Sequence, residues 1–101
     1  MAIIKVDKEN IKDIISNNKL VVIDFWASWC MPCRMLGAVL EEIASENPDL
    51  VIGKVDVDSN FDLANEYQVK SIPHLFIYRD GKLVHDILGY VAKEELMVHL
   101  K

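Results

Sequence analysis

Cysteine is scarce in this sequence: its 101 residues include two, Cys30 and Cys33, with only two residues between them. A structural disulfide stabilises a fold most when it closes a long loop, and this pair would close almost none. Hydrophobic residues make up 51% of the chain, which is enough for a compact core without structural disulfides or metals. Two cysteines this close together favour redox chemistry or metal ligation instead.

Positive charge and long apolar runs are also lacking. Lys and Arg number 11 against 16 Asp and Glu, so the net charge is -5, and without a basic stripe we expect no nucleic-acid partner. No apolar run approaches the roughly 18 residues of a membrane span, and no basic region followed by an apolar run marks a signal peptide. We therefore expect a monomeric cytoplasmic protein with no membrane partner, folded as a single domain over residues 1–101.

The hydrophobic pattern predicts an α/β fold. It indicates strands over residues 3–6, 20–26, 50–57, 74–78 and 82–88, and helices from Asp7 to Asn17 and over residues 34–46, 62–67 and 93–100. In the helix over 34–46, the expected buried side carries Met35, Leu36, Val39, Leu40 and Ile43. Early strands alternate with helices, which favours parallel pairing, whereas Asp80-Gly81 favours an antiparallel hairpin between the last two strands. The order β-α-β-α-β-α-β-β-α therefore predicts a mixed central β-sheet with helices on both faces.

Cys30 and Cys33 follow a predicted buried strand, where the next helix starts. Free N–H groups and the helix dipole favour negative charge at such a position, so the Cys30 thiolate is stabilised. The thiolate is the nucleophile of disulfide exchange. Cys33 lies one turn further on the same side of the helix, where it can attack a mixed disulfide on Cys30. Pro32 suits the first helical turn, because a backbone N–H at that position would have no acceptor within the helix, so its absence in proline costs no hydrogen bond.

Asp24 is the single charged residue in the apolar run Leu20–Trp26. Burial disfavours the charged form of a carboxyl group, so we expect a raised pKa for Asp24. A carboxyl group with such a pKa is suited to accept a proton near neutral pH.

The segment Asp24–Cys33, DFWASWCMPC, resembles the active-site segment of the thioredoxin family. Residues 54–58, KVDVD, resemble the strand that follows it in that family, and residues 71–73, SIP, resemble the family's cis-proline loop. Gly81 and Gly89 fall where the family has a turn and a loop glycine. The resemblance therefore covers essentially the whole chain.

This resemblance implies the thioredoxin fold and a thiol–disulfide oxidoreductase that reduces protein disulfides through a mixed-disulfide intermediate. Electrons would pass from a thioredoxin reductase, linked to nicotinamide or to ferredoxin, through this protein to disulfide-containing target proteins. The chain itself would need no cofactor and no metal, since both electrons travel in the sulfur pair.

The resemblance also implies roles for four residues at the reaction centre. Cys30 would be the attacking cysteine and Cys33 the buried resolving one. Asp24 would accept the Cys33 proton, and Lys54 on the neighbouring strand would partner Asp24 and partly offset the rise in its pKa.

A substrate-binding surface is implied around these residues. Trp29 would shape the surface beside Cys30, whereas Trp26 is expected in the core. Pro73 would be cis and face the cysteines, and Ile72 would offer its backbone to an extended substrate segment.

Two departures from the family pattern belong to this surface. Met31-Pro32 stands where the family usually has Gly-Pro, and Met31 adds an exposed apolar contact that biases substrate choice. His74 stands where a Thr commonly follows the cis-proline, and a protonated His74 pointing toward Cys30 would favour the thiolate. The proline often found five residues after the second cysteine is replaced by Ala38, so we expect a straighter helix.

Other interpretations of the sequence remain open. The cysteines could be incidental to a binding or assembly module, or they could hold a metal or iron–sulfur site with His74, shared between two chains. Zinc needs about four ligands, and no second CxxC or paired-His motif supplies them. A disulfide-forming, more oxidising relative is the third alternative, and the absence of a leader peptide argues against it.

Overall fold

The computed structural model describes residues 2–101 and confirms the predicted order of elements. The elements are β1 (Ala2–Lys5), α1 (Ile11–Asn17), β2 (Leu20–Trp26), α2 (Met31–Glu46), β3 (Val51–Asp56), α3 (Phe61–Glu66), β4 (His74–Arg79), β5 (Lys82–Leu88) and α4 (Lys93–Leu100). Within residues 2–101, no helix has the length and apolar character that a membrane crossing requires.

The strands form one mixed sheet in the order β1-β3-β2-β4-β5. β3 pairs in parallel with β1 and β2, whereas β4 pairs antiparallel with β2 and β5. β2 therefore lies in the centre, and its residues 21–25 are all buried, as expected of a continuous apolar run. Strand neighbours on both sides hold the carboxyl end of β2, from which the chain continues to the two cysteines.

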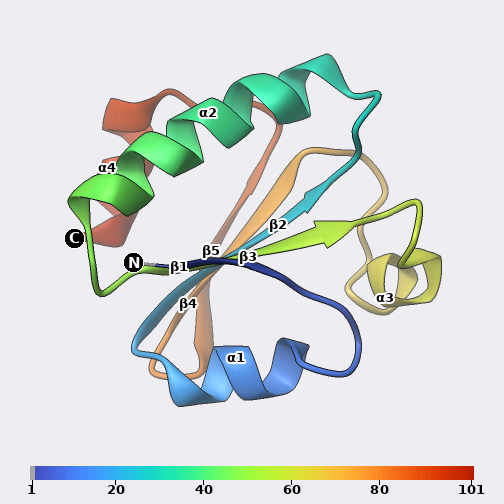
Figure 1. The fold of residues 1–101 in the computed structure, drawn as a ribbon, viewed down its shortest axis with the longest axis horizontal. Helices are drawn as coiled ribbons and strands as arrows, with labels where there is room; N and C mark the ends of the chain where they lie inside the picture. The colour runs from blue at the N-terminus through green and yellow to red at the C-terminus, as the bar shows by residue number, and fades with distance from the viewer. Residues whose placement is uncertain (1) are drawn as a thin grey trace.

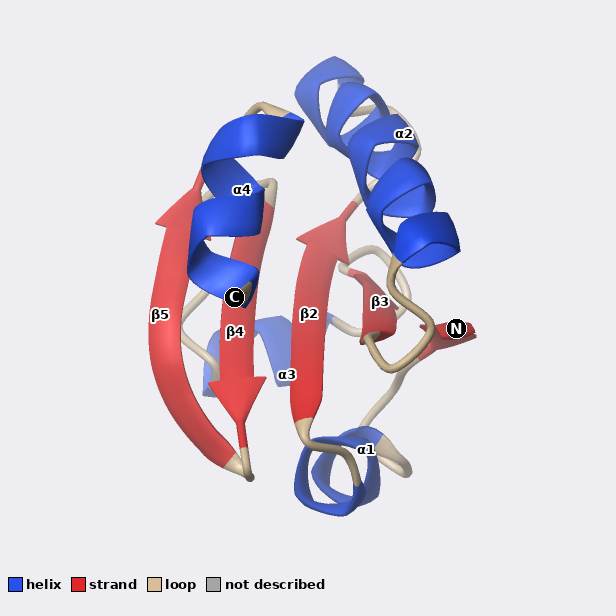
Figure 2. Cartoon of the chain, turned by 90° about the vertical axis from the view of Figure 1, so that its left-hand side faces the viewer, coloured by secondary structure: helices blue, strands red, loops and turns tan. Residues whose placement is uncertain are grey.

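Helices cover both faces of the sheet, as predicted. Figures 1 and 2 show α2 and α4 on one face and α1 and α3 on the other. Each face has its own apolar core. Under α2 and α4 it includes Val22, Leu36, Leu40, Ile43, Leu75 and Leu96, and under α1 and α3 it includes Ile11, Ile23, Phe25, Val55 and Phe76. The two cysteines belong to a third, smaller cluster at the end of β2, against which Trp26, Val57 and Ile72 pack.

Helix α2 begins earlier than the sequence predicted, at Met31 rather than Arg34. Pro32 stands in its first turn, and Cys30 is the N-cap residue with an extended backbone. The buried face of α2 also differs from the prediction, because the Met35 side chain is 52% exposed while Leu36 is fully buried. Consecutive residues point about 100° apart on a helix, so Met35 falls outside the stripe that faces the sheet.

Helix α1 begins later than the sequence predicted, at Ile11 rather than at Asp7. The N-cap residue is Asn10, whose side chain accepts no hydrogen bond from the helix. Instead, Asn10 Oδ1 accepts a hydrogen bond from the Asp7 N–H at 2.9 Å, and Asp7 Oδ1 accepts one from the Glu9 N–H at 2.8 Å. These bonds order the turn that leads into α1.

Candidate active site

The two cysteines meet at the N-terminus of α2. A disulfide joins Cys30 and Cys33, whose Cα atoms are 5.2 Å apart. The Cys33 N–H donates a hydrogen bond to Cys30 Sγ at 3.2 Å. At most N-caps, a side-chain oxygen accepts this bond from the helix, and here the sulfur takes its place. This bond and the helix dipole place Cys30 Sγ where negative charge is favoured.

The two cysteine residues differ in their exposure to solvent. Cys30 is 7% exposed, whereas Cys33 is fully buried. A substrate can therefore approach Cys30 first. Cys33 is joined to Cys30 by the disulfide and has no contact with solvent.

The loop before β4 faces the cysteines. The Ile72–Pro73 peptide bond is cis, as the resemblance implies. Ile72 O lies 4.0 Å from Cys30 Sγ, and the Ile72 side chain packs against the cysteine cluster. Pro73 is buried, and its carbonyl accepts a hydrogen bond from the Gly89 N–H at 2.8 Å, which ties the loop to the end of β5.

Asp24 lies inside the sheet and is fully buried. Neither of its carboxylate oxygens accepts a hydrogen bond from residues 2–101, and Lys54 Nζ is 3.5 Å from Asp24 Oδ2. That separation is longer than the roughly 2.7–2.9 Å of a charge-assisted hydrogen bond. Desolvation by burial outweighs the opposing charge of Lys54, and the net effect raises the pKa of Asp24 from 3.8 to about 6. The expectation of a raised pKa is confirmed.

Lys54 reaches Asp24 from the adjacent strand, since the two residues are register partners in β3 and β2. Its ammonium group lies 4.5 Å from the centroid of the Trp26 ring, within the range of a cation–π contact. Its side chain is 23% exposed. Trp26 is half-buried rather than a core residue, because its ring covers this ammonium group at the end of β2.

The residues on either side of Cys30 form an exposed rim. Trp29 is 69% exposed and Met31 is 61% exposed, and Pro32 is exposed as well. The Trp29 Nε1–H donates a hydrogen bond to Asp58 Oδ2 at 2.9 Å, which fixes the ring in an exposed position. The structure thus brings Trp29, Met31 and Pro32 together around Cys30.

His74 does have a partner, but it is not a cysteine. Its Nε2 lies 2.8 Å from Asp86 Oδ2, and because a carboxylate can only accept, Nε2 carries the hydrogen. The imidazole stacks on Phe76 with centroids 4.3 Å apart. His74 Nδ1 is buried without a partner among residues 2–101. The ring therefore belongs to the contact between β4 and β5.

Sequence reasoning missed three residues of this region. Asp58 holds the Trp29 ring, and Asp86 holds His74. Gly37 on α2 lies beside the Lys54 ammonium group, since a Cβ there would be in contact with Nζ at 3.4 Å. Asp58 and Asp86 carried no local signal, because each partner lies more than ten residues away in the chain. Gly37 did carry a local signal, because a glycine inside a helical pattern often marks a position where another group packs closely against the helix.

No group of three or more His, Cys, Asp or Glu side chains within residues 2–101 is arranged to hold a metal ion.

Comparisons with known proteins give a consistent result. The family model described as Thioredoxin matches residues 2–101. The chain is 40% identical over 95 residues to "Thioredoxin" of Mycoplasmoides gallisepticum, covering 94% of this chain and 95% of that protein. It is 48% identical over 86 residues to "Bifunctional thioredoxin reductase/thioredoxin" of Mycobacterium leprae, covering 84% of this chain and 19% of that protein. A mutant thioredoxin from Halobacterium salinarum NRC-1 superposes with a TM-score of 0.89 at 35% identity, covering 97% of this chain and 87% of that one.

Proposed function

Because this chain belongs to the thioredoxin family and is a thiol–disulfide oxidoreductase, we propose that Cys30 attacks disulfides of protein substrates and Cys33 resolves the intermediate. The Cys30 thiolate attacks one substrate sulfur, so a bond forms between Cys30 Sγ and that sulfur while the substrate disulfide breaks and its other sulfur leaves as a thiolate. The Cys33 thiolate then attacks Cys30 Sγ and releases the second substrate thiolate. Two electrons pass from the cysteine pair to the substrate.

The difference in burial between the two cysteines carries this assignment. Cys30 is 7% exposed, and its Sγ accepts a hydrogen bond from the Cys33 N–H at the helix N-terminus, whereas Cys33 is fully buried. The nucleophile of disulfide exchange is a thiolate, and these surroundings stabilise it at Cys30.

We assign Asp24 as the acceptor of the Cys33 proton. A pKa of about 6 keeps most of its carboxyl groups ionised at neutral pH and still makes it a stronger base than an ordinary Asp. Lys54 is a positioning residue, which holds the carboxylate from the neighbouring strand.

The substrate would bind across the exposed rim and the cis-proline loop. Ile72 offers its backbone beside Cys30, and Pro73 shapes the loop next to it. Trp29, Met31 and Pro32 supply apolar contacts around the sulfur. His74 would contact the substrate at the edge of this surface.

A thioredoxin reductase would return the oxidised protein to its dithiol form. The M. leprae relative supports this partner, because its name joins reductase and thioredoxin in one protein. Parallel assays with a nicotinamide-linked and a ferredoxin-linked reductase would identify the electron source.

We further propose a cytoplasmic monomer with a single domain and no bound cofactor.

Replacing each cysteine with serine tests the assignment. Cys33→Ser should accumulate a covalent complex between Cys30 and a protein disulfide substrate such as insulin, which dithiothreitol then releases. Cys30→Ser should form no such complex, and both variants should lose insulin reduction. A complex that forms through Cys33 in the Cys30→Ser protein would reverse the two roles.

A further inference from the structure

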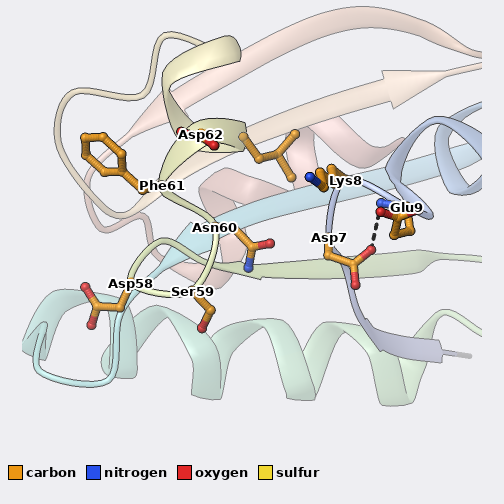
Figure 3. A pocket seen from close by; sticks show the side chains of 9 residues that line it. Asp7, Lys8, Glu9, Asp58, Ser59, Asn60, Phe61 and Asp62 are labelled. Atoms are coloured by element: carbon orange, nitrogen blue, oxygen red, sulfur yellow. Dashed lines mark hydrogen bonds between the residues drawn. The ribbon is translucent and has the colours of Figure 1, made fainter.

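Met31 follows Cys30 directly and lies largely in solvent. It is the first residue of α2, with Cys30 as the N-cap, and it is 61% exposed. Within residues 2–101, it belongs to none of the three apolar clusters. The residue on the other side of Cys30 is held differently, because the Trp29 Nε1–H donates a hydrogen bond to Asp58, which Figure 3 shows on the turn after β3. A hydrogen bond therefore fixes Trp29, whereas Met31 places an unburied thioether next to the attacking sulfur.

Two other methionines of the described chain serve as comparisons. Met35 lies on the same helix, one turn further from Cys30, and is 52% exposed. Met97 lies in α4 and packs, partly buried, against the core under α2 and α4. Met35 therefore shares the exposure of Met31 but not its position beside Cys30, and Met97 shares neither property.

An exposed thioether reacts with peroxides. Met31 Sδ would attack one oxygen of hydrogen peroxide, so an S–O bond forms while the O–O bond breaks, and the leaving hydroxide takes the proton of the transferred oxygen and departs as water. The sulfur loses two electrons and the peroxide gains them. The product is methionine sulfoxide, a polar side chain that methionine sulfoxide reductases convert back.

The disulfide form of the protein is the form in which this reaction competes best. Cys30 and Cys33 are joined, so neither offers a thiolate, which is the cysteine species that peroxides attack. The exposed thioethers are then the sulfur atoms open to oxidation. An oxidant that keeps the protein in its disulfide form would therefore also direct oxidation to Met31.

We propose that Met31 is an oxidation-sensitive modification site, at which hydrogen peroxide lowers the reactivity of this protein toward protein disulfides. The sulfoxide replaces an apolar contact beside Cys30 with a polar group, and protein substrates react more slowly once the dithiol is restored. The fold is unaffected, because Met31 lies outside the apolar clusters. Glutathione disulfide is small and has no bulky apolar group, so its rate stays the same. This inference rests on the proposed function, because it assumes that Cys30 attacks the substrate.

Peroxide treatment of the oxidised protein tests the proposal. The protein is treated in its disulfide form, freed of peroxide and reduced with dithiothreitol, and peptide mass spectrometry then measures the sulfoxide at each methionine. Trp fluorescence follows the rates at which the reduced protein reacts with insulin and with glutathione disulfide. Met31→Leu keeps an apolar side chain without a thioether, and Met31→Gln resembles the polar sulfoxide. Met35→Leu is the matched control, since it removes the other exposed thioether of α2.

Met31 and Met35 should be oxidised at least about fivefold faster than Met97, because susceptibility follows exposure. Treated wild-type protein should react about fivefold more slowly with insulin, as expected for the loss of one partial apolar contact, and within about twofold of the untreated rate with glutathione disulfide. Met35→Leu should show the same loss on treatment, whereas Met31→Leu should show none. Untreated Met31→Gln should behave as the treated wild type does, and methionine sulfoxide reductases should restore the treated wild type.

A protein that carries the Met31 sulfoxide and still reduces insulin at the untreated rate would overturn the proposal. An equal loss of the glutathione disulfide rate would also overturn it, since the sulfoxide would then impair the site in general. A Met35→Leu protein that resists the treatment would assign the effect to Met35 instead. An untreated wild-type protein that reduces neither disulfide would overturn the proposed function itself.

Discussion

Lys54 approaches Asp24 to 3.5 Å and yet does not compensate for the burial of its carboxylate. Desolvation is the largest influence on the pKa of Asp24, and the Lys54 charge is the second, in the opposite direction. The net result is a pKa of about 6. Above that pH, the folded protein holds an ionised carboxylate that would be more stable in water. The ion pair with Lys54 therefore reduces the desolvation cost of this carboxylate without removing it.

The first prediction concerns stability and pH. A group whose pKa is raised from 3.8 to about 6 on folding binds its proton more tightly in the folded state, so it favours folding more at low pH than at high pH. Ionised Asp24 therefore lowers the free energy of unfolding. This loss is absent below about pH 4, is complete above about pH 6 and amounts to roughly 3 kcal/mol. Asp24→Asn has no such titration and should lack this part of the pH dependence.

Urea unfolding of the oxidised protein at several pH values between 4 and 7.5 measures this difference. The free energy of unfolding of Asp24→Asn minus that of the wild type should rise with pH across this window. Because other carboxyl groups titrate equally in both proteins, the difference isolates Asp24. A difference independent of pH would mean that Asp24 has an ordinary pKa in the folded state.

The second prediction concerns the partner of this carboxyl group. Since the Lys54 charge lowers the pKa of Asp24, Lys54→Met should raise that pKa further, above about 6. Lys5→Met is the matched control, because Lys5 is the register partner of Lys54 on β1 and makes no ion pair with Asp24. Carbon-13 NMR titration of the Asp24 carboxyl group distinguishes the two variants. An equal pKa in both variants would remove Lys54 from the site.

Much of the scaffold around this pair could be predicted from local sequence pattern. Successive side chains of a strand point to opposite faces of the sheet, so a continuous apolar run has to be buried on both faces. This pattern predicted β2 as a central strand, and its residues 21–25 are buried. The helical spacing after Cys33 identified α2, but the spacing alone does not say how wide the buried stripe is. Met35 lies just outside it and is 52% exposed.

Contacts between distant segments could not be predicted in this way. The Trp29–Asp58 hydrogen bond joins the start of the active-site helix to the turn after β3, and the His74–Asp86 contact joins two strands. Both depend on sheet register, which a strand pattern does not fix. The β4–β5 register also shifts between Ile77 and Tyr78, an irregularity without a signal in the sequence.

The third prediction concerns the reduction potential. A protein that reduces disulfides in the presence of glutathione needs a Cys30–Cys33 potential below the glutathione poise. The His74 ring is held by Asp86 and stacked on Phe76. His74→Thr should therefore shift the potential by less than about 30 mV, which for two electrons is about a tenfold change in the equilibrium constant.

Equilibration against dithiothreitol buffers, with Trp fluorescence as the readout, measures both potentials. A wild-type value above the glutathione poise would indicate an oxidising or isomerising site. A large shift in His74→Thr, absent from Asp86→Asn, would show that His74 acts on the cysteines directly.

The last prediction compares two buried glycines that differ in their surroundings. Gly37 lies inside α2, where alanine is the better helix former by about 1 kcal/mol, and its new Cβ would meet Lys54 Nζ at 3.4 Å without a clash. Gly53 lies in β3, where a Cβ would come within 2.6 Å of Val6 Cγ2 and 2.9 Å of Ile23 Cδ1. Gly37→Ala should raise the free energy of unfolding by roughly 0.5–1 kcal/mol, whereas Gly53→Ala should lower it by about 1–3 kcal/mol.

Urea unfolding of the two oxidised variants gives the sign of each change. Because the substitution is the same, opposite signs would show that close packing of β3, and not a general effect of alanine, makes Gly53 necessary. A Gly37→Ala protein that is less stable than the wild type would mean that the Lys54 ammonium group needs the space beside α2. In that case the Asp24 pKa should change in the same variant, because Lys54 could no longer keep its position next to the carboxylate.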